Sequence, residues 1–176
     1  MYYNENPDEN LYQGDILRNL PIVILPDQLE IARPIIPTKV SEGLIEAELK
    51  LESELPDAFS KGTELILASA YSANIIILSQ TCDIDHREFV AVAPIFPLEQ
   101  VEGKSRRDAV KENRVNHRFY LPPVADFVES YVDFTVINSV KRSRLNVANR
   151  IASLSDLYRH HLAEALHRFF CRPFLP

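Results

Sequence analysis

A cluster of small polar, thiol and acidic side chains follows an unbroken apolar run in this chain. The apolar run is Ile75-Ile76-Ile77-Leu78, and the positions after it supply hydroxyl, amide, thiol, carboxylate and imidazole groups. A thiol, an imidazole and a carboxylate are the parts of a nucleophile, its base and an orienting acid. The sequence therefore offers Cys82, Asp83 and His86 as candidate catalytic residues.

The acidic neighbours of Cys82 argue against a catalytic thiol. The carboxylates of Asp83 and Asp85 disfavour the thiolate, which is the reactive form of cysteine. The structural alternative is a small residue that packs at the end of a strand. Both interpretations stay open at the level of sequence.

Metal binding is another interpretation of the same segment. Asp83 and Asp85 are candidate ligands for a Mg²⁺ ion that also contacts substrate phosphates. A zinc site would need a second pair of ligands far along the chain, for which His167 and Cys171 are the candidates. An acidic loop in water explains these residues equally, and we expect no resident cofactor.

Uncharged hydrogen-bonding groups near two expected strand ends form a candidate binding site. If the turn at Gly14-Asp15 lies beside the end of the apolar run, these groups converge on one cleft. There they could recognise a base edge or a peptide, or they could satisfy the backbone of the turn itself. The candidate binding residues are Gln13, Gly14, Asp15, Ser79, Gln80, Thr81 and Arg118.

A strand buried on both faces is the element that must position this cluster. A short, β-branched run such as residues 75–79 is typical of such a strand. Residues 89–95 predict a second buried strand, and residues 82–88 a hairpin-like acidic connection between the two. Further strands are predicted over residues 21–26, 117–121 and 129–137.

The C-terminal part predicts an amphipathic helix over residues 155–172. Its apolar residues recur at three- and four-residue steps and make one broad face. Ser155 is the expected N-cap and Pro173 ends the helix. Residues 105–113 predict a shorter, charged surface helix.

Length and composition indicate one β-rich α+β domain over residues 1–176. Residues 1–10 are polar and predict a loose N-terminal arm. Residues 38–62 predict a surface insertion, in which helix and strand patterns compete. Only 4 glycines are present, so no glycine-rich phosphate loop can be assembled.

Charge and hydropathy limit the partners of the chain. A formal net charge of −6 argues against broad, non-specific nucleic-acid binding, although local basic patches at residues 106–107 and 141–144 keep nucleic acid as an alternative partner. No apolar run is long enough for a membrane helix, and the N-terminus lacks the pattern of a signal peptide. We therefore expect a cytoplasmic protein with two free cysteines and no membrane partner.

The order of the strands resembles that of the MazF/PemK family of endoribonuclease toxins. The resemblance rests on a Gly-Asp turn, a strand that ends in Ser, and a strand that ends in Ala-Pro-Ile; these segments are Gln13-Gly14-Asp15-Ile16, residues 75–79 and residues 90–95. It implies a small SH3-like β-barrel with a C-terminal helix packed against it. That family usually carries Arg-Pro before the second segment and Thr or Ser after the third, where this chain has Ala73-Asn74 and Phe96-Pro97.

These departures separate two classes of function. Without the family's Arg and Thr/Ser, the expectation is a bacterial accessory or regulatory module that binds nucleic acid, nucleotide or a protein partner through the cleft at residues 75–79. Its setting would be a toxin–antitoxin or phage-defence system, with a protein partner or a homo-oligomer. The alternative is an enzyme, either a diverged endoribonuclease or a Cys82-dependent hydrolase.

Overall fold

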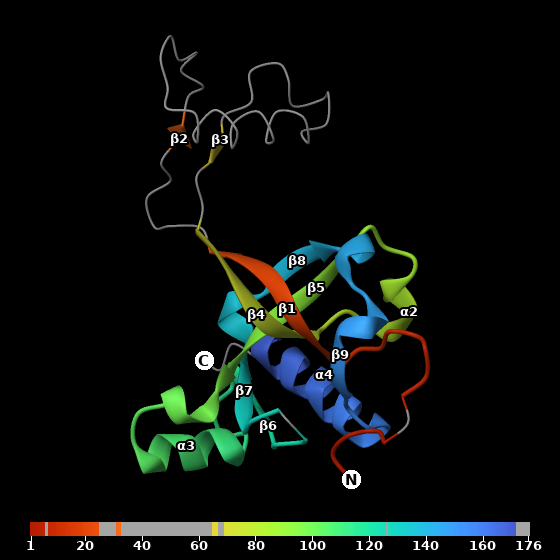
Figure 1. Ribbon diagram of the computed structural model, residues 1–176. Coiled ribbons are helices and arrows are strands. Elements are labelled where there is room, and N and C mark those ends of the chain that lie inside the picture. The colour runs from red at the N-terminus through yellow and green to blue at the C-terminus, as the bar shows by residue number, and fades with distance from the viewer. Residues whose placement is uncertain (6, 25–30, 33–64, 67–68, 126, 172–176) are drawn as a thin grey trace. The chain divides into compact units, whose positions relative to one another are not determined.

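A curled antiparallel sheet with one long helix against it forms the body of the computed structural model (Figure 1). The structure describes residues 1–5, 7–24, 31–32, 65–66, 69–125 and 127–171. The strands are β1 (Asp15–Ile24), β2 (Ile31–Ala32), β3 (Leu65–Ile66), β4 (Ser69–Ile77), β5 (Phe89–Pro97), β6 (Arg118–Leu121), β7 (Ser130–Asp133), β8 (Asn138–Lys141) and β9 (Arg150–Ser153). The α-helices are α2 (Thr81–Ile84), α3 (Lys104–Lys111) and α4 (Asp156–Phe170).

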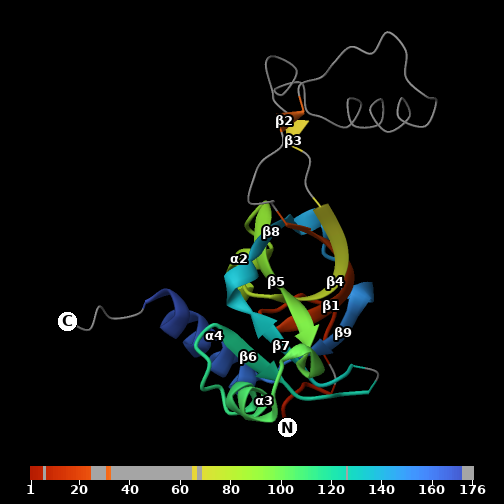
Figure 2. The same ribbon diagram turned by 90° about the vertical axis from the view of Figure 1, so that its left-hand side faces the viewer.

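Within the described residues, seven strands join in the order β6-β7-β5-β4-β1-β9, with β8 as a further partner of β5. β7 and β8 follow one another along β5, where Ile95 lies opposite Val132 and Val92 lies opposite Asn138. Figure 2 shows these strands curling into a half-barrel. Of the predicted α+β domain built on a small β-barrel, the mixed α and β composition and a curled half-barrel sheet with a C-terminal helix are confirmed.

Contacts divide the chain into two units, residues 1–22 with 71–176, and residues 23–70. In the second unit, β2 and β3 pair in antiparallel fashion. The predicted insertion at residues 38–62 and the tail at 172–176 lie outside the described residues. No described helix is long and apolar enough to cross a membrane.

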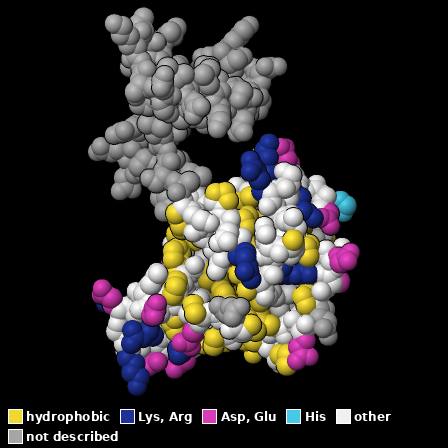
Figure 3. All heavy atoms as spheres, viewed as in Figure 1, with side chains coloured by type: hydrophobic (Ala, Val, Ile, Leu, Met, Phe, Trp, Pro, Cys, Tyr) yellow, Lys and Arg dark blue, Asp and Glu magenta, His cyan; other side chains and the backbone are white. Residues whose placement is uncertain are grey.

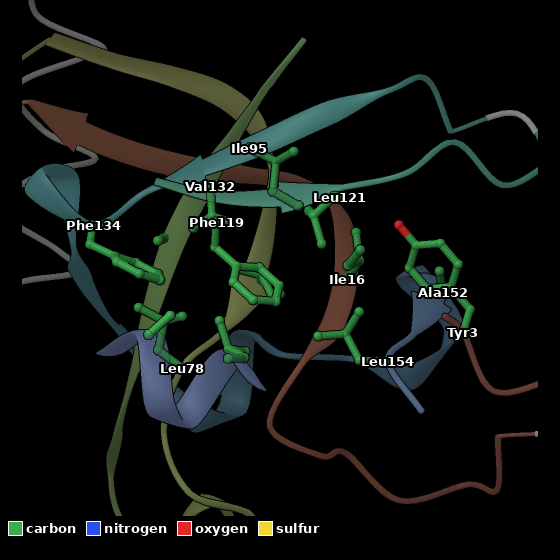
Figure 4. Packing of buried hydrophobic residues seen from close by; sticks show 14 of the residues in the cluster. Tyr3, Ile16, Leu78, Ile95, Phe119, Leu121, Val132, Phe134, Ala152 and Leu154 are labelled. Atoms are coloured by element: carbon green, nitrogen blue, oxygen red, sulfur yellow. The ribbon is translucent and has the colours of Figure 1, made fainter. Parts of the chain in front are cut away.

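The last residues of the central strand β4, Ile75 to Ile77, are buried on both faces of the sheet, as the sequence predicts. Ile76 and Leu78 face an apolar cluster that includes residues of α4, whereas Ile75 and Ile77 face a second cluster inside the curl of the sheet. Alternate side chains of a strand point to opposite faces, so an unbroken apolar run can serve two cores. Figure 4 shows Phe119 and Phe134 of the first cluster between the strands and a helix.

The predicted strand over residues 129–137 is too long. It divides into β7, the 3-10 turn η3 (Phe134–Val136) and β8. The carboxylate of Asp133 accepts hydrogen bonds from the backbone N–H of Thr135 at 3.0 Å and from its hydroxyl at 2.6 Å. These local bonds compete with the strand ladder and turn the chain.

The N-terminal segment is anchored, in contrast to the loose arm that the sequence predicts. Tyr3 is buried and forms a β-bridge with Leu154, and the ring of Tyr2 stacks on Tyr158 of α4 with their centroids 3.6 Å apart. Two aromatic side chains bury enough apolar area to hold a polar segment in place.

The predicted C-terminal helix is present as α4, with two corrections to its details. The hydroxyl of Ser155 donates to the carbonyl of Met1 and makes no capping hydrogen bond with the helix. Leu157 and Phe170, expected on the buried face, are exposed, whereas Leu162 and Ala165 are buried.

Candidate functional site

The turn before β1 lies against the end of β4, as the sequence analysis expects. The side-chain amide of Gln13 donates to the carbonyl of Leu78 at 2.7 Å, and the backbone N–H of Gln13 donates to the hydroxyl of Thr81 at 3.2 Å. The backbone N–H of Gly14 donates to the carbonyl of Ile77 at 2.9 Å. These bonds bring the two segments together and position the start of α2.

Gly14 has a structural reason for its place in this turn. Its φ is +86°, a region that residues with a side chain rarely adopt. A Cβ atom added there would lie 3.0 Å from Cδ1 of Leu154. Backbone conformation and packing therefore both require glycine, independently of any ligand.

Several predicted binding groups are used inside the molecule. The hydroxyl of Ser79 accepts a hydrogen bond from the backbone N–H of Ala91 at 2.9 Å, and Thr81 accepts the bond from Gln13 described above. Gln80 and Cys82 are exposed. Thr81 is exposed too, and its hydroxyl, which accepts the bond from Gln13, can still donate one, so the groups of residues 80–82 face a ligand.

Asp15 is an internal anchor. Its carboxylate has no exposed surface and lies 3.0 Å from a guanidinium nitrogen of Arg150, whose side chain is 7% exposed. It also accepts hydrogen bonds from the hydroxyl of Ser153 at 2.5 Å and the backbone N–H of Tyr12 at 3.0 Å. A buried carboxylate paired in this way ties β1 to β9.

Arg150 extends this anchor to the N-terminal segment. Its guanidinium donates to the carbonyl of Asn10 at 2.7 Å and also to the carbonyl of Asp8. Residues 8–10 are therefore fastened to β9.

The acidic segment after β4 forms a set of ion pairs. Asp83 lies 3.8 Å from Arg87, one turn along the chain. Two nitrogens of Arg142 donate to the same oxygen of Asp85 at 2.8 and 3.1 Å. The backbone N–H of Arg142 also donates to the carbonyl of Glu88 at 2.8 Å, which fixes this edge.

An exposed aromatic ring stands beside these ion pairs. Phe89, at the start of β5, is 51% exposed. It lies opposite Lys141 of β8, whose amino group is 6.0 Å from the centre of the ring and 3.7 Å from the carboxylate of Glu88. We call the face formed by residues 80–89 and 141–144 the α2 surface. Figure 3 shows positive and negative side chains interspersed on the side of the molecule where α2 lies.

The predicted catalytic residues lie on the α2 surface without forming a poised triad. The thiol of Cys82 donates a weak hydrogen bond to the amide oxygen of Gln80, with the sulfur 3.8 Å from the oxygen. The backbone N–H of His86 donates to the carbonyl of Asp83 at 3.1 Å. Among the described side chains, no three His, Cys, Asp or Glu groups gather as a metal site.

Arg118 belongs to another part of the sheet. It lies 3.4 Å from the carboxylate of Asp133 and 4.7 Å from the centre of the Tyr131 ring, both on β7. Arg118 thus forms an ion pair across the two paired strands β6 and β7. The described contacts of Arg118 do not include the residues at the end of β4.

A second charged region surrounds α3. A cavity of about 520 Å³ is lined by both basic and acidic side chains of that region, including Lys104, Arg107 and Asp108. At its edge, Glu129 accepts a hydrogen bond from Lys111 at 2.8 Å and from the Tyr120 hydroxyl at 2.5 Å, and these bonds lower the pKa of Glu129. Burial and the Glu129 carboxylate raise the pKa of Tyr120.

Phe89, Lys141 and Arg142 are the residues that sequence reasoning did not join to the candidate site. Phe89 was assigned only to a strand, and the other two only to a basic run. Asp85 and Arg142 are 57 positions apart, so their contact depends on the pairing of β5 with β8. No protein-family model matches the chain, and no curated protein matches it.

Proposed function

We propose that this chain is a non-catalytic accessory or regulatory module that binds a protein partner through the α2 surface. The observation that carries the proposal is the exposed ring of Phe89 beside the ion pairs of Lys141 and Arg142. Protein interfaces concentrate their binding energy in aromatic and arginine side chains at the centre of a polar rim. The α2 surface combines these parts on a fixed backbone.

Charge pairing favours a protein over a nucleic acid. Arg87, Lys141 and Arg142 each lie next to a carboxylate of the same surface. Affinity for a phosphate backbone comes from cations that release condensed counterions, and a paired cation must first give up its carboxylate. Alternating charges of both signs instead suit a partner with complementary charges of both signs.

The distribution of charge along the chain bears on the choice between a protein and a nucleic acid as the partner. Residues 23–70 carry 9 acidic and 4 basic residues, so 16 acidic and 15 basic residues remain in the other unit, whose net charge is −1. The unit that holds the α2 surface is thus nearly neutral. Repulsion by its net charge would not keep nucleic acid away, and the argument for a protein rests on the local pairing.

An enzyme is the less favoured reading of the same surface. Catalysis by a cysteine needs a thiolate activated by a base or a nearby cation. The described partner of the Cys82 thiol is the amide oxygen of Gln80, which accepts a hydrogen bond from the thiol and does not act as a base. Asp83 and Asp85, the candidate acids and Mg²⁺ ligands, each lie beside an arginine.

The resemblance to the MazF/PemK family supplies the setting of the proposal. We propose an SH3-like identity for the half-barrel, and a role in a cytoplasmic bacterial toxin–antitoxin or phage-defence system. A module that keeps such a fold without the family's Arg and Thr/Ser would serve by binding. A second copy of the chain is the other candidate partner for the α2 surface.

Affinity isolation from the source cells tests the proposal with matched variants. The tagged wild type, Phe89→Ser and Val128→Ser are compared; Val128 is another exposed apolar residue, on the loop before β7. We expect the wild type and Val128→Ser to recover a partner protein whose binding survives nuclease treatment. With Phe89→Ser, the amount of this partner should fall about tenfold or more. Equal recovery with all three would overturn the proposal.

A parallel assay separates the enzyme alternative from the binding module. Wild type and Cys82→Ser are incubated with a mixed RNA pool, with and without Mg²⁺. The proposal predicts no cleavage by either protein. Cleavage that disappears in Cys82→Ser would replace the binding module with the enzyme.

A further inference from the structure

The outer edge of β8 is an open strand edge. β8 pairs with β5 on one side, and it has no other strand partner among the described residues. Ser139 and Lys141 are exposed. An open edge presents backbone N–H and C=O groups to which an extended chain can pair.

The register shows which backbone groups face outward. Ala91 of β5 directs its N–H and C=O toward the end of β4, where they bond to Ser79 and to Leu78. Residues along an antiparallel pair alternate between bonding the partner and facing away. Because Ala91 lies opposite Ser139, the N–H and C=O of Ser139, and two residues later those of Lys141, point away from β5.

Cations lie at the end of this strand, where the chain leaves β8 in the 3-10 turn η4 (Arg142–Arg144). Lys141, Arg142 and Arg144 follow in sequence, and the side chain of Arg144 is exposed with no ion pair among the described residues. The exposed ring of Phe89 lies opposite Lys141, on the neighbouring strand. A strand added here would meet the open backbone groups of β8 and, beyond the end of β8, the exposed cation of Arg144.

We propose that the outer edge of β8 receives an extended acidic segment of a partner protein, which adds a strand to the half-barrel. This rests on the proposed function and names the mode of binding at one side of the α2 surface. Backbone hydrogen bonds to Ser139 and Lys141 supply the pairing, and acidic side chains meet Arg144, the cation beside this edge that has no ion pair among the described residues. An apolar side chain of the segment covers Phe89.

Charge complementarity selects an acidic segment over a second copy of the chain. In an antiparallel pair of two β8 edges centred on Val140, Lys141 would face Ser139 of the other copy, and the strand Asn138–Lys141 carries no carboxylate. A second copy therefore brings no acidic side chain from its strand to Arg144 in the turn that follows. An acidic segment that runs past the end of β8 does.

Selection from a phage-displayed library of random decapeptides tests the proposal with a defined probe. We expect selected peptides that alternate acidic and apolar residues. The amides of Ser139 and Lys141 should exchange with solvent rapidly in the free protein and become protected when a selected peptide is bound, as followed by NMR. No enriched peptide, enrichment without acidic residues, or no protection of these two amides would each overturn the proposal.

Two variants separate the strand edge from the aromatic ring. Ser139→Pro removes an outward N–H without removing a bond to β5, and Ser139→Ala keeps the backbone intact. Strand addition predicts that the selected peptide loses about tenfold or more of its affinity for Ser139→Pro and none for Ser139→Ala. If Phe89→Ser abolishes binding and Ser139→Pro does not, the proposed function stands and strand addition fails. If both bind as wild type does, both proposals fail.

Discussion

The side-chain amide of Gln13 donates to the backbone carbonyl of Leu78 at 2.7 Å, and this bond fastens the turn before β1 to the end of β4. Leu78 is buried, so if the Gln13 amide is removed, the carbonyl of Leu78 loses its hydrogen bond and cannot replace it with one to bulk water. We predict that Gln13→Leu lowers the free energy of unfolding by about 1–2 kcal/mol, measured in urea. Gln80→Leu is the matched control on the exposed side, with a change below about 0.5 kcal/mol. Equal effects would show that the Gln13 bond does not hold the turn.

The buried pair of Asp15 and Arg150 predicts a large but non-additive loss of stability. Asp15→Ala leaves the guanidinium buried without its carboxylate, which should cost about 3–5 kcal/mol. Asp15→Ala with Arg150→Met removes both charges and should cost less than the sum of the single changes. Urea unfolding of the four proteins measures the coupling, and additive losses would contradict a direct ion pair.

The Glu129 carboxylate predicts a pH-dependent stability. Hydrogen bonds from Lys111 and Tyr120 lower its pKa in the folded state, so folding favours the ionised form. The contribution is complete above the ordinary pKa of Glu, about 4.3, and is lost as the pH falls through the lower folded-state pKa. The difference in unfolding free energy between wild type and Glu129→Gln should therefore shrink in acid. A difference that stays constant from neutral to acidic pH would exclude this linkage.

Cysteine labelling distinguishes an inert from an activated thiol. Because the described partner of Cys82 is a neutral amide, iodoacetamide should modify it no faster than it modifies glutathione at neutral pH. Cys171, which is also exposed, is the internal control. Cys82 is labelled in the variant Cys171→Ser, and Cys171 is labelled in the variant Cys82→Ser. Labelling of Cys82 that clearly exceeds both references would favour the hydrolase.

The sequence predicted the elements whose signals are local. The run at 75–78 indicated a strand buried on both faces because each of its residues is apolar, and the three- and four-residue steps of 156–170 indicated α4. The break at η3 was missed because it depends on a side-chain bond from Asp133 rather than on hydrophobic pattern. In α4, the same apolar pattern could not show that Leu157 remains exposed.

The contact between the turn at residues 13–14 and the end of β4 could be predicted from the sequence, but the internal bonds of these residues could not. The proximity of Gln13 and Thr81 follows from two neighbouring strand ends. That Asp15 is buried against Arg150 depends on the pairing of β1 with β9, which lie at opposite ends of the chain. The exposure of Phe89 is likewise a tertiary property, because the residue belongs to an apolar strand pattern.

Photo-crosslinking at position 89 tests the binding role of the α2 surface most directly. A benzophenone amino acid replaces Phe89 in the source cells, and the same group at Val128 is the control for an exposed apolar site. We predict that the group at position 89 forms a crosslinked adduct with a partner, and that this adduct resists nuclease and is destroyed by protease. The group at position 128 should form no such adduct. An adduct destroyed by nuclease, or equal adducts at the two positions, would contradict a protein-binding surface at α2.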